Sequence, residues 1–136
     1  MLIAAYAIQH NAVGVAVYVF QSAPLAIVFI VSGIALAVWG ERTFAAAGTE
    51  IMPAAATNKK LVTDGPFRFT RNPMYSGLIL TSLGVAFYFG TLPFFVVPVL
   101  VFLLCNFVFI PFEEAKMLRQ HSDQYTEYLA RVRRWV

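Results

Sequence analysis

Residues 72–112 read NPMYSGLILTSLGVAFYFGTLPFFVVPVLVFLLCNFVFIPF and contain no Lys, Arg, Asp or Glu. A transmembrane helix needs about 20 mainly apolar residues, so this run is long enough for two helices that cross a bilayer as a hairpin. The turn between them is marked by Gly90, Thr91 and Pro93. Residues 1–40 are equally free of charge. They predict a second hairpin of the same kind.

The charged residues are confined to two blocks. All ten Lys and Arg and all seven Asp and Glu lie in Glu41–Arg71 or in Glu113–Arg134. The chain is 60% hydrophobic and 12% charged, whereas soluble domains carry roughly 25% charged residues. We therefore expect one domain, residues 1–136, that forms an all-α integral membrane protein with about four transmembrane helices. The expected spans are roughly residues 2–20, 25–42, 73–89 and 93–110.

The positions of the basic residues predict the orientation. Lys and Arg are enriched in cytoplasmic segments, so residues 47–72 and 113–136 should be cytoplasmic, and the N-terminus with them. Because the basic residues flank membrane spans, we interpret the net charge of +3 as contact with membrane lipid and expect no nucleic-acid partner.

A single cysteine, Cys105, excludes an intramolecular disulfide, and the two histidines are far apart, so no metal site is expected.

Polar residues inside the first expected span, Gln9, His10 and Asn11, have two interpretations. They form packing hydrogen bonds between helices, or they line a substrate pocket.

The C-terminal block has a helical pattern. Its apolar residues recur at helical spacing, and charged residues occupy the other side. We expect an amphipathic interfacial helix from Glu113 to Trp135, lying on the membrane surface or folded over the bundle. Pro111 disfavours a straight continuation of the fourth span into this helix. The apolar stripe is Leu118, Tyr125, Leu129, Val132 and Trp135, and the polar side is Lys116, Arg119, Asp123 and Glu127.

Two clusters of polar residues are candidates for chemistry. The sequence LVTDGPFRFTRNPMYSG, residues 61–77, combines a turn, basic side chains and a helix start at Asn72–Pro73. Helix N-termini attract anions, so this segment is an anion site beside Arg71 or a basic loop that only sets topology. Glu113 and Glu114 are a solvated helix start or a paired acidic site. Together the two clusters suit a zwitterionic ligand.

These motifs resemble a known family. Residues 61–77, Glu113–Glu114, the tyrosines Tyr125 and Tyr128, and Arg134–Trp135 resemble the isoprenylcysteine carboxyl methyltransferase family, which belongs with the membrane phospholipid methyltransferases. The chain departs from the family pattern at four places. Asn72 stands in place of His, Phe67 in place of Tyr, His121–Ser122 in place of Phe-Gly, and Arg133 in place of Pro.

The resemblance implies methyl transfer from S-adenosylmethionine at the cytoplasmic membrane face. By position, the cofactor would be bound by Arg71, Asn72, Tyr75 and Glu113, and the catalytic residues beside the reacting group would be Glu114 and Arg134. Arg71 suits the carboxylate of this cofactor and Glu113 suits its ammonium group.

The implied acceptor is lipophilic, a prenylated cysteine or peptide that ends in a carboxylate. Three alternatives remain at this point: a phospholipid N-methyltransferase, an NADPH-dependent membrane reductase of the sterol type, and a non-catalytic membrane scaffold.

Overall fold

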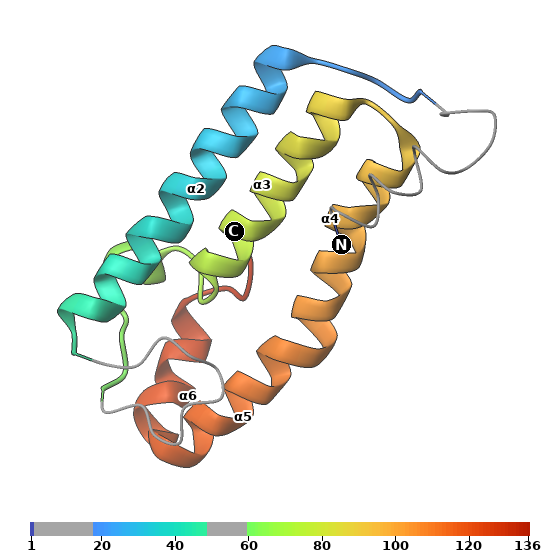
Figure 1. Ribbon diagram of the computed structural model, residues 1–136. Coiled ribbons are helices and arrows are strands. Elements are labelled where there is room, and N and C mark those ends of the chain that lie inside the picture. The colour runs from blue at the N-terminus through green and yellow to red at the C-terminus, as the bar shows by residue number, and fades with distance from the viewer. Residues whose placement is uncertain (2–17, 49–59) are drawn as a thin grey trace.

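The computed structural model describes Met1, residues 18–48 and residues 60–136. The regular elements in these ranges are all helical, which confirms the expected all-α class. Figure 1 shows α2 and α3 side by side, and α4 continuing into α5 at the end where α6 folds back. The elements are α2 (Ala23–Ala46), the 3₁₀ turn η1 (Gly65–Arg68), α3 (Pro73–Phe89), α4 (Leu92–Leu104), the π-helical turn η2 (Cys105–Phe109), α5 (Ile110–Gln120) and α6 (Ser122–Arg131).

Two of the described helices are long and apolar enough to cross a membrane, namely Ala23–Ala46 and Leu92–Gln120. The third, α3, is apolar but has 17 residues, somewhat fewer than the usual span of about 20. These three helices occupy the positions expected for the second, third and fourth spans. The first expected span, with Gln9, His10 and Asn11, lies outside the described residues except for residues 18–20.

Residues 18–20 are not helical, although the expected span included them. The amide of Val19 donates to the carbonyl of Gly90 at 2.8 Å, and Tyr18 forms an isolated antiparallel bridge with Thr91. The chain therefore runs extended along the α3–α4 turn. It enters α2 at Ser22, whose side chain caps that helix.

The seam between α2 and α3 is built from small residues. A Cβ atom added to Gly33 on α2 would lie 2.6 Å from the carbonyl oxygen of Gly77 on α3, and one added to Gly84 would lie 2.9 Å from the carbonyl oxygen of Ala26. No side chain fits at these points, so the two backbones touch. Small residues at helix contacts are typical of membrane proteins, where close packing drives association.

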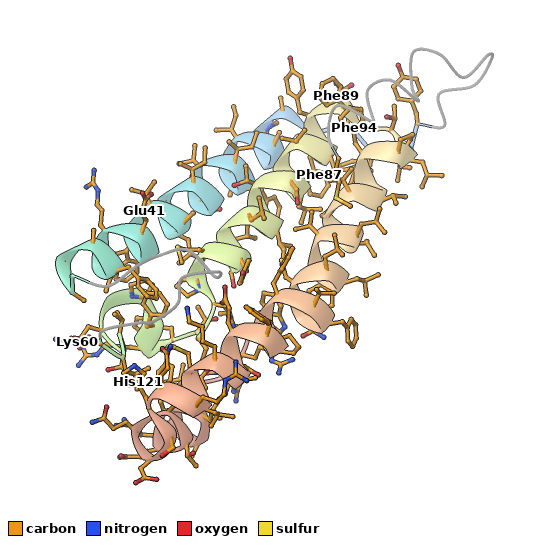
Figure 2. All side chains as sticks on the ribbon, turned by 60° about the horizontal axis from the view of Figure 1, so that its bottom comes forward. Glu41, Lys60, Phe87, Phe89, Phe94 and His121 are labelled. Carbon is orange, nitrogen blue, oxygen red and sulfur yellow. The ribbon has the colours of Figure 1, made fainter. Side chains whose placement is uncertain are left out.

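Large apolar side chains cover the outside of the bundle. Ile27 on α2 is 63% exposed, and Phe107 in η2 is 69% exposed. Many other large apolar side chains of α2, α4 and η2 are exposed in the same way, and soluble monomers rarely expose so much apolar surface, whereas a bilayer can solvate it. Aromatic residues gather at one end of the bundle, where Phe89 and Phe94 stack with ring centroids 4.1 Å apart. Figure 2 shows this pair near the α3–α4 turn, and Lys60 and His121 toward the opposite end.

The fourth span does not stop at Pro111 as expected. The helix is continuous from Leu92 to Gln120, over 29 residues, and the turn before the proline is π-helical. There the amide of Ile110 donates to the carbonyl of Cys105. This wider turn lets the chain pass the proline, which stands in the first turn of α5 where its missing N–H is tolerated.

The single C-terminal helix expected from Glu113 to Trp135 is also wrong. The helix breaks at His121, which has φ −137° and ψ 40°, and the chain is extended again from Val132. The break lets α6 fold back so that Tyr125 and Tyr128 pack against Phe67. The predicted sides shift accordingly, because Lys116 is buried and Leu118 is exposed.

Candidate functional site

The loop before α3 is anchored by its Gly-Pro-Phe sequence. Gly65 has φ +57°, and a Cβ atom there would lie 2.7 Å from the hydroxyl of Thr43 on α2, so both conformation and space require glycine. Phe67 is buried, and its carbonyl accepts a hydrogen bond of 2.7 Å from the hydroxyl of Tyr128. The loop is thus fastened to α2 on one side and α6 on the other.

The two buried tyrosines of α6 are uncharged. Burial raises the pKa of Tyr125 to about 12, with a further increase from the charge of Glu114. Burial also raises the pKa of Tyr128 above its ordinary value. Both phenols therefore stay protonated at physiological pH.

The C-terminal segment lies along the same loop. The amide of Arg71 donates to the carbonyl of Arg133 at 2.9 Å. The hydroxyl of Thr70 and the side-chain amide of Asn72 both donate to the carbonyl of Arg134, at 3.0 and 2.9 Å. These bonds bring Arg134 next to the start of α3, more than sixty positions away in the sequence.

Asn72 does not cap α3 with its side chain. It stands at the N-cap position, but no side-chain hydrogen bond caps the helix, because its amide group is turned to the C-terminal segment. The first turn of α3 therefore keeps amide groups that a ligand can use.

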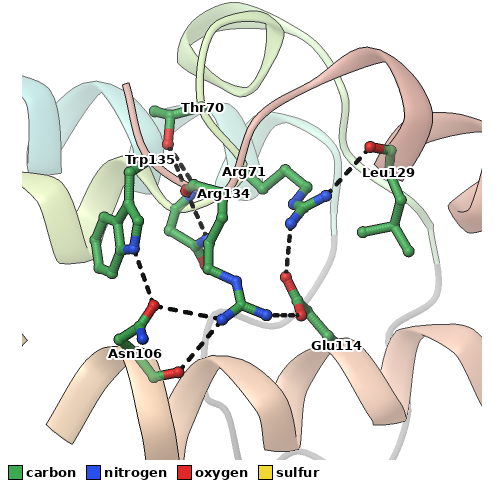
Figure 3. A network of polar contacts seen from close by, with 8 residues as sticks. Thr70, Arg71, Asn106, Glu114, Leu129, Arg134 and Trp135 are labelled. Atoms are coloured by element: carbon green, nitrogen blue, oxygen red, sulfur yellow. Dashed lines mark hydrogen bonds and ion pairs between the residues drawn. The ribbon is translucent and has the colours of Figure 1, made fainter. Parts of the chain in front are cut away.

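A carboxylate joins the two arginines of the site. Oε1 of Glu114 lies 3.0 Å from Nη2 of Arg71, and Oε2 lies 2.6 Å from Nη2 of Arg134 (Figure 3). The Glu114 side chain is 16% exposed and that of Arg71 is 12% exposed. Both carboxylate oxygens are thus engaged, and the group of three carries a net charge of +1.

The neighbouring carboxylate has different partners. Oε1 of Glu113 accepts a hydrogen bond of 2.8 Å from the hydroxyl of Tyr75, and the Tyr75 ring stacks on Phe109 with centroids 6.2 Å apart. Successive side chains on a helix point about 100° apart, which explains why adjacent glutamates separate in this way. Glu113 and Glu114 therefore have separate partners, although they lie on one turn of α5.

All six residues predicted from the resemblance gather at this end of the bundle. Four of them form the network of Arg71, Asn72, Glu114 and Arg134, and the other two form the pair of Tyr75 and Glu113.

Sequence reasoning missed two members of the network. Asn106 accepts hydrogen bonds from Arg134 and from the indole of Trp135, and its amide in a membrane span was a usable signal. Thr70 is 1% exposed, and it lies within the motif of residues 61–77, where its own side chain was not singled out.

Two buried polar atoms have no hydrogen-bond partner within the described ranges, Nε of Arg71 and Oγ of Ser76. Buried polar groups in folded proteins are nearly always satisfied, so an exception marks a place where a ligand can be bound. Both residues adjoin the uncapped start of α3. This end of the helix is therefore suited to an anionic group.

A comparison with known protein families gives a match. A family model described as phospholipid methyltransferase matches residues 22–124, which run from α2 into α6 and include the five candidate residues from Arg71 to Glu114. Arg134 lies beyond the matched range. The comparisons with curated proteins and with solved structures gave no match.

Proposed function

The chain belongs to the phospholipid methyltransferase family, and from that premise we propose that it transfers a methyl group from S-adenosylmethionine to a lipophilic acceptor. Membership confirms the superfamily expected from the sequence motifs. Together with the apolar helices, it identifies the chain as a membrane protein. Proteins of this family use S-adenosylmethionine as methyl donor.

The residues present fit this cofactor. When bound, S-adenosylmethionine supplies an electrophilic methyl group on a sulfonium, and it also carries a carboxylate and an ammonium group. Arg71 and the uncapped start of α3 would hold the carboxylate, with Ser76 as a further donor. Glu113, fixed by Tyr75 through Oε1, would hold the ammonium group with Oε2.

A carboxylate is the acceptor that the geometry supports best, as in O-methylation of an isoprenylcysteine-like substrate. The observation that carries this proposal is the double pairing of Glu114, whose two oxygens are bound to arginines and so are not placed to remove a proton. A carboxylate is already ionised at neutral pH and needs no base. Arg134, which is 33% exposed, would hold its negative charge, and the chain would contribute positioning.

N-methylation of a phospholipid amine is the second candidate. The description of the matched family favours it. An amine must lose a proton before it attacks. The bond from Tyr75 uses Oε1 of Glu113, so in this alternative Oε2 would accept that proton in place of holding the cofactor's ammonium group. A reductase that uses NADPH has no support from the family match.

Acceptor identity separates these candidates. Purified protein with labelled S-adenosylmethionine should methylate S-farnesylcysteine, at a rate nearly flat from about pH 6 to 8 because a carboxyl pKa lies near 4. An amine acceptor should react faster as pH rises. Label in phosphatidylethanolamine vesicles and none in S-farnesylcysteine would replace the first candidate by the second.

The proposed site faces the cytoplasm, as the basic residues suggest. In a Cys105→Ala background, a cysteine at Gln21 should react with an impermeant thiol reagent added outside intact cells. One at Asp64 should react only after permeabilisation. Both positions are exposed, so the opposite pattern would reverse the proposed orientation.

A further inference from the structure

Asn106 lies in the π-helical turn Cys105–Phe109, next to the proposed active site. Its main-chain carbonyl has lost its helical donor, because the amide of Ile110 donates to Cys105 and the next residue, Pro111, has no N–H. An unpaired carbonyl in an apolar helix is costly. The turn therefore needs a donor from another part of the chain.

Arg134 is that donor. Its Nη1 lies 3.4 Å from the carbonyl oxygen of Asn106 and 3.3 Å from the side-chain Oδ1. The indole Nε1 of Trp135 donates to the same Oδ1 at 3.1 Å. One asparagine thus contacts two successive side chains of the C-terminal segment, as Figure 3 shows.

The guanidinium of Arg134 is therefore held at two corners. Nη1 is bound to Asn106 and Nη2 is bound to Glu114, and these contacts use at most three of its five N–H groups. The side chain is still 33% exposed. An arginine with a fixed orientation, spare donors and partial exposure is suited to binding an anion.

We propose that Asn106 is a positioning residue, which orients Arg134 so that its remaining N–H groups bind the anionic headgroup of the methyl acceptor. That anion is the carboxylate of an acidic lipid or the phosphate of a phospholipid. The inference rests on the proposed function, and it adds a residue of the membrane helix that positions the arginine by which acceptors would be selected. Asn106 acts through Arg134 and leaves cofactor binding untouched.

The test compares Asn106→Leu, which has a similar size and no acceptor, with Asn106→Asp, which keeps acceptor oxygens for both donors. The probe is S-farnesylcysteine or phosphatidylethanolamine vesicles, whichever the wild-type protein methylates. Asn106→Leu should raise the acceptor KM about tenfold, the loss of one hydrogen bond to a charged group. Affinity for S-adenosylhomocysteine should stay within twofold, and Asn106→Asp should restore most of the KM.

A double-mutant cycle isolates the coupling. In an Arg134→Gln background, Asn106→Leu should raise the acceptor KM no further, and an additive increase would overturn the proposal. Val108→Ala, an exposed residue of the same turn, is the matched control and should leave KM unchanged. Should Asn106→Leu not fold, Asn106→Ser carries the same prediction, because its shorter side chain cannot reach both donors.

Fluorescence gives a readout independent of activity. In a Trp39→Phe background, the emission of Trp135 should shift on Asn106→Leu and return on Asn106→Asp. An unchanged acceptor KM in Asn106→Leu, with an active wild type, would overturn this inference alone. A wild-type protein that methylates neither probe would overturn the proposed function instead.

Discussion

Two regions of this molecule are stabilised by opposite means. Along the middle of the bundle, α2 and α3 touch through glycines and a few small side chains, and no charged residue of α3 takes part. At the end of the bundle where α3 begins, the loop before α3, α5 and the C-terminal segment are joined by ion pairs and hydrogen bonds. The seam is stabilised by close packing of small residues, and the network is stabilised by paired charges and directed hydrogen bonds.

This difference indicates how the two regions should respond to mutation. A seam of backbone against backbone tolerates no added atoms, but it contains no group that could take part in chemistry. The network contains unsatisfied donors and partly exposed charges, which cost stability in an isolated protein and are useful where a ligand binds. Substitutions in the seam should therefore abolish folding, whereas those in the network should reduce binding and turnover first.

The largest effect is expected in the seam. A Cβ atom at Gly77 would lie 2.5 Å from the carbonyl oxygen of Gly33, so Gly77→Val must push the helices apart, at a cost above about 4 kcal/mol. Gel filtration in detergent should show aggregated protein. The matched control is Ala35→Val on the exposed face of α2, which should elute as the wild type does. A folded Gly77→Val protein would show that the helices do not touch here.

The next effect concerns the centre of the network. Glu114→Gln leaves two guanidinium groups facing a neutral amide, which should cost about 3 kcal/mol of stability and at least about a hundredfold in methyl transfer. Thermal unfolding and initial rates measure the two. Glu127→Gln removes the exposed pair with Arg131, at 3.9 Å, and should change neither quantity measurably. Equal responses of the two variants would contradict the contrast between buried and exposed charge.

A smaller effect is expected at Glu113, the residue proposed to bind the ammonium group of the cofactor. Glu113→Gln keeps an oxygen for the hydroxyl of Tyr75 and loses the negative charge, so stability should hold while affinity for S-adenosylhomocysteine falls about tenfold. Isothermal calorimetry measures the affinity. Glu41→Gln, at an exposed position of α2, should bind as the wild type does. Unchanged affinity in Glu113→Gln would remove this residue from the cofactor site.

The smallest effect is confined to alkaline pH. Burial raises the pKa of Tyr125 to about 12, whereas an unfolded tyrosine titrates near 10. The folded state therefore holds the proton more tightly. This contribution to stability is complete below about pH 10 and is lost as pH rises from there toward 12. Tyr125→Phe should flatten that loss in unfolding midpoints measured from pH 8 to 11.5. An unchanged slope would indicate that the phenol is solvated.

Much of the helix pattern was predictable, since long charge-free runs have few alternatives in water or lipid. Asn72–Pro73 marked the start of α3 correctly because proline favours the first helical position. The expectation that Pro111 interrupts the helix was wrong, because a π-helical turn allows a proline within a continuous helix. The break at His121 depends on contacts of α6 with the loop, and these are tertiary.

The proximity of the candidate residues could be predicted from the sequence, and their pairing could not. The resemblance indicated which side chains gather, but the rotation of α5 decides that Glu114 joins both arginines while Glu113 meets Tyr75. A shift of α5 by one residue would exchange the partners of the two glutamates. Asn106 was overlooked because its partners lie in the C-terminal segment, which was expected to be helical and is extended.

The most direct test of the central claim is a titration of the purified protein with S-adenosylhomocysteine and, separately, with NADPH. The proposed function predicts saturable binding of S-adenosylhomocysteine that weakens in Glu113→Gln and is unaffected by an equal concentration of NADPH. Saturable binding of NADPH with none of S-adenosylhomocysteine would contradict it, and would assign the network around Glu114 to a reductase.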